Sequence, residues 1–199
     1  MICFFDTETS GLPNKKSPRL ELQPHLMQIA ISLYDKDRRP VYEISSLVAL
    51  PEEVTPSAEA LETHGITPEL SRKYGILPTQ AIALLRFACM RAELVVAHNF
   101  QFDEKLIDFA VQRAGQDFSP LSIVPKFCTL EATTPILKLP PTESMIKWGH
   151  GDKFKSPKLT EAYKFFFNEE LSGAHDALID TRACARVYYH LLDNGLIPS

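Results

Sequence analysis

Residues 1–13 have the sequence MICFFDTETSGLP, and the predicted fold is built around them. Side chains alternate between the two faces of a strand. The unbroken apolar run Ile2–Phe5 therefore gives both faces an apolar start, which is typical of a strand buried on both sides. Asp6 and Glu8 follow on one face, about 7 Å apart. Burying two like charges is costly unless something compensates for them, and a divalent metal ion with oxygen ligands would do so. An edge strand that turns both acids towards water is the alternative.

Length and composition indicate one domain or at most two, and we expect a single domain of residues 1–199. The chain has 199 residues, of which 45% are hydrophobic and 23% are charged, ordinary values for a globular protein with a full core. The formal net charge of -4 provides no overall basic field for holding long stretches of nucleic acid. This argues against a tight, extended duplex binder and leaves room for an enzyme that grips a few nucleotides.

The cysteine pattern indicates a cytoplasmic protein. Cys3, Cys89, Cys128 and Cys184 are scattered without the spacing of a metal site, so we expect reduced thiols. The N-terminal apolar run meets Asp6 after only four residues and is too short for a signal peptide. No apolar run approaches the ~18 residues that a membrane span needs, so no membrane association is expected.

The apolar patterns that follow predict an α/β domain. Strands are expected at 27–35 and 41–50, joined by a hairpin turn, with a buried parallel strand at 94–97 and a last strand within 123–129. Helices are expected at 57–63, 79–91, 102–114, 130–137, 158–167 and 174–194. Prolines break up the rest of 51–78, which is expected to be irregular, and 142–157 is expected to be a polar loop.

Two of these helices place an acid on their apolar face. Asp103 lies one turn before the apolar stripe of the helix at 102–114, and Asp180 lies one turn before the apolar face of the last helix. Helix capping is the alternative for Asp103. Buried acids are rare unless paired, and no basic residue shares these faces. Four acids from three elements therefore favour one shared site, whose charge of about -4 would be neutralised by two divalent ions, Mg²⁺ or Mn²⁺.

His175 is the predicted general base of this site. It precedes Asp180 by five residues, at the entry to the last helix. Histidine is the side chain best suited to accept a proton near neutral pH, and a two-metal site suits the displacement chemistry of phosphodiesters. A surface or capping role is the alternative for a lone histidine.

Three blocks of the sequence resemble those of the DEDDh 3′–5′ exonucleases, a family that includes the proofreading subunit of bacterial replicative DNA polymerase, ribonuclease T and oligoribonuclease. The blocks are FFDTETSGLP, AHNFQFDEKLI and AHDALIDTRACARVYY, in the family's order. The resemblance implies a ribonuclease H-like fold, with a central mixed five-stranded sheet flanked by helices. It also implies hydrolysis of the terminal phosphodiester at a 3′ end, with release of nucleoside 5′-monophosphates. By position, Asp6, Glu8, Asp103 and Asp180 would hold the metals and His175 would be the base.

The resemblance also suggests substrate-binding residues. Thr7 and the backbone near Glu8 would contact the terminal nucleotide, and Leu12 would wedge against its base. An exposed apolar residue in a turn beside an acidic site has base contact as one use, and a core contact is the alternative for Leu12. His64 lies in THGIT, a segment similar to the family's loop near the terminal sugar.

The second block and a basic loop leave further alternatives open. His98 and Asn99 would either position the strand end or satisfy the loop backbone. Phe102 would line the base pocket or anchor the helix start in the core. The Lys147–Lys158 segment interleaves aromatic residues with lysines, a pattern that either tracks a single-stranded backbone or forms a solvated loop.

Three functions compete on this evidence. The first is a metal-dependent 3′–5′ exonuclease acting on single-stranded DNA or frayed 3′ ends, and the second is the same reaction on short or single-stranded RNA. The third is a non-catalytic nucleic-acid-binding module on an enzyme fold, which the complete set of acids and His175 argues against. The expected partner is nucleic acid with a free 3′ end. The chain would be free-standing or would dock to a polymerase or another replication protein, and its oligomeric state stays open.

Overall fold

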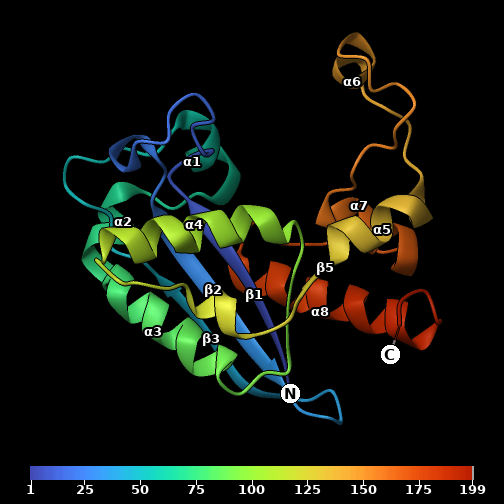
Figure 1. Cartoon of the computed structure of the whole chain (residues 1–199), viewed down its shortest axis with the longest axis horizontal. Helices are drawn as coiled ribbons and strands as arrows, with labels where there is room; N and C mark the ends of the chain where they lie inside the picture. The colour runs from blue at the N-terminus through green and yellow to red at the C-terminus, as the bar shows by residue number, and fades with distance from the viewer. Residues whose placement is uncertain (199) are drawn as a thin grey trace.

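The computed structural model describes residues 1–198 and contains a five-stranded sheet with the order β3-β2-β1-β4-β5 (Figure 1). The strands are β1 (Ile2–Thr9), β2 (Leu26–Tyr34), β3 (Pro40–Leu47), β4 (Leu94–Ala97) and β5 (Lys126–Cys128). β1 is antiparallel to β2 and parallel to β4, so the first strand lies at the centre of a mixed sheet. The predicted mixed five-stranded sheet is confirmed.

Helices connect the strands and cover the sheet. Within the described residues they are α1 (Ala58–His64), α2 (Pro68–Tyr74), α3 (Pro78–Cys89), α4 (Phe100–Arg113), α5 (Thr129–Leu137), α6 (Glu143–Lys147), α7 (Leu159–Phe167) and α8 (Ala177–Asp193), with 3-10 turns η1 (Leu20–Leu22) and η2 (Pro120–Ile123). Across residues 1–198, none of the helices combines the length and apolar character needed to cross a bilayer.

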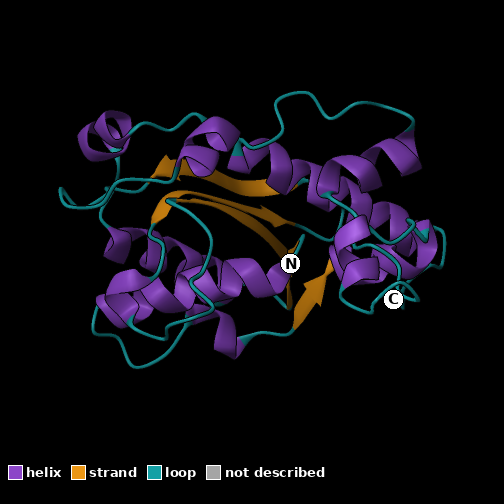
Figure 2. Cartoon of the chain, turned by 90° about the horizontal axis from the view of Figure 1, so that it is seen from above, coloured by secondary structure: helices purple, strands orange, loops and turns teal. Residues whose placement is uncertain are grey.

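The sheet lies between two helical layers (Figure 2). On one face, Phe5 of β1 belongs to the same core cluster as Leu85 of α3 and Leu106 of α4. On the other face, Phe4 packs edge-on against Tyr188 of α8, with ring centroids 5.6 Å apart. Consecutive residues of β1 therefore enter two different cores, which explains why its sequence begins with an unbroken apolar run.

Two segments expected to lack regular structure contain helices. The prediction for 51–78 is wrong at α2, where the Thr67 hydroxyl accepts a hydrogen bond from the backbone N–H of Leu70 at 3.2 Å. Pro68 is the first residue of α2. A backbone N–H at this position would have no partner within the helix, so proline loses no hydrogen bond there. The loop predicted at 142–157 likewise contains α6, which Thr142 caps through the backbone N–H of Met145 at 3.2 Å.

Several boundaries also differ from the prediction. α8 begins at Ala177 rather than 174, because the Asp176 carboxylate caps it by accepting two backbone N–H groups of the first turn. His175 has a left-handed φ of 72° and so lies outside the helix. α4 begins at Phe100, two residues earlier than predicted, and β3 ends at Leu47, three residues earlier.

We predict that Ser71→Ala lowers the free energy of unfolding by about 1–3 kcal/mol. The fully buried Ser71 hydroxyl of α2 donates to Val48 O at 2.7 Å and accepts from the backbone N–H of Leu50 at 3.0 Å. Alanine would leave both backbone groups buried without this partner. Urea unfolding followed by circular dichroism measures the change. Ser122→Ala, at an exposed serine, is the control, and equal stability of the two variants would contradict the prediction.

Candidate active site

Four carboxylates from three elements meet in one pocket. Asp6 and Glu8 lie towards the C-terminal end of β1, Asp103 lies in the first turn of α4, and Asp180 lies in the first turn of α8. All four line a cavity of about 330 Å³, together with His175. The structure thus brings together the five side chains predicted as metal ligands and base.

The topology explains this convergence. β1 and β4 are parallel, and α4 begins almost directly after β4, so its N-terminus lies beside the C-terminal half of β1. The carboxyl ends of parallel strands are where open α/β sheets place their ligand sites. α8 crosses the other face and contacts both β1 and β2. Its start is tied to the sheet, because the Gln28 Oε1 of β2 accepts the backbone N–H of Ala177 at 3.2 Å.

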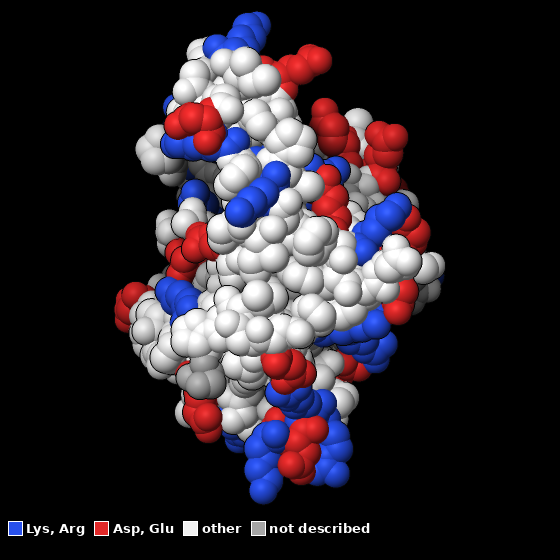
Figure 3. All heavy atoms as spheres, turned by 90° about the vertical axis from the view of Figure 1, so that its right-hand side faces the viewer, with Lys and Arg blue, Asp and Glu red and all other residues white. Residues whose placement is uncertain are grey.

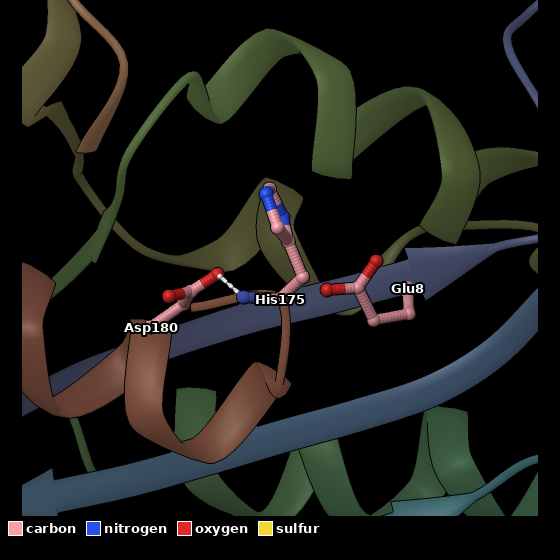
Figure 4. Close-up of side chains that lie close together, drawn as sticks. All are labelled: Glu8, His175 and Asp180. Atoms are coloured by element: carbon pink, nitrogen blue, oxygen red, sulfur yellow. Dashed lines mark hydrogen bonds between the residues drawn. The ribbon is translucent and has the colours of Figure 1, made fainter. Parts of the chain in front are cut away.

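His175 projects from the turn before α8, and its side chain is exposed. Its backbone N–H donates to Asp180 Oδ2 at 3.0 Å, which fixes the turn to the helix. Figure 4 shows the imidazole standing between the carboxylates of Glu8 and Asp180. Gly173 also has a left-handed φ of 76°, and a Cβ there would lie 2.5 Å from Cδ1 of Ile179. The turn that presents His175 is therefore tightly packed against α8.

Burial and mutual repulsion raise the pKa values of these acids. Burial, followed by the negative charges of Asp180 and Asp103, raises the pKa of Glu8 to about 8. Burial raises the pKa of Asp103 to about 7, opposed by hydrogen bonding from Thr7, whose hydroxyl donates to Asp103 Oδ1 at 2.6 Å. The pKa values of Asp6 and Asp180 are raised as well, by burial first. The pocket therefore disfavours four ionised carboxylates in the absence of a cation.

The donor atoms fit a divalent cation. Carboxylate oxygens of Glu8 and Asp180 and a ring nitrogen of His175 lie within 4.8 Å of one another, so a cation held by the carboxylates would be close to the imidazole. Asp180 Oδ1 is buried and has no hydrogen-bond partner among the described residues. An orphaned carboxylate oxygen is costly to bury, and a cation would satisfy it. A set rich in carboxylate oxygens suits Mg²⁺ or Mn²⁺.

A second cavity of about 580 Å³ adjoins the acids and contains three predicted substrate-contacting residues. Leu12, His64 and Phe102 line it, and it shares Glu8 and Phe102 with the acidic pocket. Leu12 is 83% exposed, so it does not lie in the core. His64 Nε2 donates to Thr9 O at 3.0 Å, and burial lowers its pKa. The His64 ring thus holds the loop after β1 as a neutral side chain.

The remaining predicted contacts have different local roles. The Thr7 hydroxyl proton is already committed to Asp103. His98 Nε2 donates to Pro157 O at 3.0 Å, and its Nδ1 lies 2.9 Å from Thr129 Oγ1. Burial lowers the pKa of His98 to about 4. His98 thus satisfies a loop backbone, and because it also lines the acidic pocket, its contact with the strand end stays a prediction. Asn99 lines the pocket with an exposed side chain that makes no capping hydrogen bond.

Sequence reasoning missed two residues around the site. Asp176 caps α8, and its charge contributes to raising the pKa of Asp6. Gln28 anchors the start of α8. Lys158, the last residue of the predicted Lys147–Lys158 segment, lines the acidic pocket. An aspartate directly before a long apolar-periodic helix is an N-cap signal, so Asp176 could have been found. The contact of Gln28 joins residues far apart in the chain and has no local signal.

Comparison with known proteins places this geometry in a family. The RNase T family model, described as an exonuclease model, matches residues 3–188. The chain belongs to this exonuclease family. The match confirms the predicted relationship to DEDDh-type 3′–5′ exonucleases. A search of curated proteins finds no significant sequence match.

Solved structures share the exonuclease fold. Exonuclease I of E. coli in complex with a dT13 oligonucleotide superposes with a TM-score of 0.74 at 18% identity, over 96% of this chain and 40% of that chain. Exonuclease I from Methylocaldum szegediense superposes with a TM-score of 0.70 at 19% identity, over 96% of this chain and 40% of that chain. At these identities the likeness shows the fold. The chain spans about two fifths of the length of these exonuclease I structures.

We predict that Glu8→Gln stabilises the metal-free exonuclease at alkaline pH. Because folding raises the pKa of Glu8 from 4.5 to about 8, its contribution to stability is fully present below the unfolded pKa and is lost as the pH rises through about 8. In EDTA, the variant should exceed the parent by more than about 1 kcal/mol at about pH 9 and match it at about pH 4. Urea unfolding at each pH measures this. Glu53→Gln, at an exposed acid, is the control. If the free energy of unfolding of Glu8→Gln follows the same pH dependence as that of the parent, the prediction is contradicted.

Proposed function

We propose that this chain is a metal-dependent 3′–5′ exonuclease that hydrolyses the terminal phosphodiester of single-stranded DNA or frayed 3′ ends and releases nucleoside 5′-monophosphates. The observation that carries the proposal is the meeting of four carboxylates and an exposed imidazole in one pocket. Structures of E. coli exonuclease I in complex with dT13 and dA16 oligonucleotides support a DNA substrate.

Asp6, Glu8, Asp103 and Asp180 would hold two divalent ions, Mg²⁺ or Mn²⁺. The unpartnered Asp180 Oδ1 and the raised pKa values of the acids fit such ions, and an E. coli exonuclease I complex is described as zinc-bound. When bound, the ions supply charge neutralisation and Lewis-acid stabilisation of the oxygens around the reacting phosphorus. Thr7 supports this set by holding Asp103 through its hydroxyl.

His175 acts as the general base. Its imidazole stands beside Glu8 and Asp180 and accepts a proton from the attacking water. The water oxygen forms a bond to the terminal phosphorus, and the bond from phosphorus to the 3′ oxygen of the preceding nucleotide breaks. That 3′ oxygen leaves and takes up a proton, so the terminal residue departs as a 5′-monophosphate. The hydrogen bond from the His175 backbone N–H to Asp180 Oδ2 fixes the turn. The imidazole therefore stays beside the acids.

The terminal nucleotide would occupy the neighbouring cavity. Leu12 and Phe102 provide apolar surface for a base on the side of Glu8, and apolar contact with a base face is tolerant of sequence. Asn99 offers a free side-chain amide at the acidic pocket for positioning the strand end. His64 keeps the cavity wall in place through Thr9 O.

The proposal extends to a cytoplasmic protein with a single domain over residues 1–199 that is free-standing or docks to a polymerase or another replication protein. The four cysteines are free thiols, in keeping with a reducing compartment. An exoribonuclease is the alternative function, and a test of both nucleic acids separates the two.

We predict that His175→Ala and Asp180→Asn separate proton transfer from metal binding. His175→Ala should lower kcat by about 10²–10⁴-fold, the usual worth of a general base, while the rise in Tm on adding Mn²⁺ largely persists. Asp180→Asn should lose nearly all turnover and most of that rise, because it removes a metal ligand. Calorimetry and a gel-based nuclease assay measure both. A wild-type rate for His175→Ala at neutral pH would reject its role as base.

We predict that the purified chain degrades a 5′-labelled DNA strand to a descending ladder in Mg²⁺ and leaves it intact in EDTA. A matched RNA strand should be degraded more slowly, because the proposal assigns DNA as the substrate. Thin-layer chromatography identifies the products as 5′-monophosphates. Faster digestion of RNA would replace the proposed substrate with RNA, and failure to cut either strand would reject the enzyme.

A further inference from the structure

An arm formed by residues 139–156 projects from the body between α5 and α7, with α6 near its tip (Figure 1). In Figure 1 the arm rises above the sheet on the right, and α1, which lines the cavity of about 580 Å³, lies above the sheet on the left. The neck of the arm is closed, because the Lys155 backbone N–H donates to Leu139 O at 3.0 Å. Lys155 also pairs with Glu161 of α7. The arm is therefore a tethered loop with a fixed base.

The base of the arm forms part of the acidic pocket. Ser156, Pro157 and Lys158 line that pocket together with the carboxylates. Pro157 is buried, and its carbonyl accepts the His98 Nε2–H at 3.0 Å. His98 is anchored in turn by Thr129, the first residue of α5. A strand whose 3′ end enters the pocket would leave it close to the base of the arm.

The surface of the arm is basic and unusually apolar. Trp148 is 75% exposed and Ile146 is 59% exposed. Lys147 and Lys153 are exposed and make no ion pair among the described residues. The arm contains three lysines and two acids, and the flanking Lys138 and Lys158 raise the count to five lysines against two acids, whereas the whole chain has a net charge of -4. Figure 3 shows Lys and Arg side chains interspersed with acidic and uncharged ones on this side of the molecule.

We propose that the arm binds the single-stranded DNA that lies 5′ of the scissile bond, an inference that rests on the proposed function. Trp148 stacks on a base, while Lys147 and Lys153 contact phosphates. Aromatic side chains among basic ones are the usual platform for single strands. The local positive charge complements a polyanion in a chain that is otherwise acidic. Trp148 is ten residues from Lys158, a separation of up to about 35 Å, which leaves room for it to contact nucleotides upstream of the terminal one.

The test uses Trp148 itself, because it is the only tryptophan of the chain. Oligothymidylate of about 20 nucleotides is titrated into the full chain in EDTA, where hydrolysis is suppressed. Stacking should quench the tryptophan fluorescence in a saturable way. Lys147→Ala/Lys153→Ala should raise Kd about tenfold at low salt and reduce the slope of log K against log salt by about 1.4, the worth of two phosphate contacts on a single strand.

Two controls isolate the arm from general charge effects. Lys147→Arg/Lys153→Arg keeps the charges and should bind like the parent. Lys36→Ala/Lys73→Ala removes two exposed lysines from the β2–β3 turn and α2 and should leave Kd within about twofold. In Mg²⁺, the lysine-to-alanine arm variant should show a raised KM on the long strand and unchanged turnover of a dinucleotide, which cannot reach the arm.

The outcomes separate this proposal from the nuclease proposal. Quenching by oligothymidylate in a chain that cuts nothing in Mg²⁺ supports the arm and rejects the nuclease. Absent quenching, or an unchanged Kd and salt slope in the arm variant, overturns the arm. Quenching by oligouridylate alone also overturns it as a DNA surface. A protein partner that quenches Trp148 where neither nucleic acid does would give the arm a different ligand and overturn the proposal.

Discussion

The repulsion among four carboxylates packed against a folded core is the constraint on which this structure depends. Burial raises the pKa values of Glu8 and Asp103 to about 8 and 7, so the fold holds charges together that would separate in water. It can do so because each acid sits at the end of an element whose other residues are firmly packed. Asp6 follows Phe4 and Phe5, both buried. The strain of the site is thus offset by the two cores on either side of β1, and cations would relieve it.

In this arrangement, the start of α8 is held rigid while the imidazole of His175 remains accessible. Gln28 and Asp176 fix the first turn of α8, and this turn fixes both Asp180 and the backbone of His175. The imidazole itself remains exposed. A base that must accept and release protons needs water and substrate access, whereas a metal ligand needs rigidity. The short segment from His175 to Asp180 supplies both, since one residue lies in a left-handed turn and the other in a capped helix.

Local periodicity was sufficient for the central strand and for placing the acids on strand and helix faces, whereas the mixed five-stranded sheet was expected from the resemblance to the DEDDh exonucleases. Apolar residues on both faces of Ile2–Phe5 report double burial, and an acid one turn before an apolar stripe reports a helix face. It was insufficient where a residue's role depends on context. Pro68 begins α2 where a proline can equally end a helix. His98 Nε2 donates to the carbonyl of Pro157, 59 residues further along the chain. Only the fold brings these two residues together.

His98 joins the site to the arm in a way that follows from its protonation. With its pKa lowered to about 4, the ring is neutral near pH 7, so one nitrogen must donate and the other must accept. A carbonyl can only accept, which assigns the proton to Nε2 facing Pro157 O and leaves Nδ1 to accept from the Thr129 hydroxyl. The two hydrogen bonds of His98 therefore add no charge to a pocket that already contains four acids. They fix the wall formed by Ser156, Pro157 and Lys158 while leaving the cations and the substrate as the partners of the carboxylates.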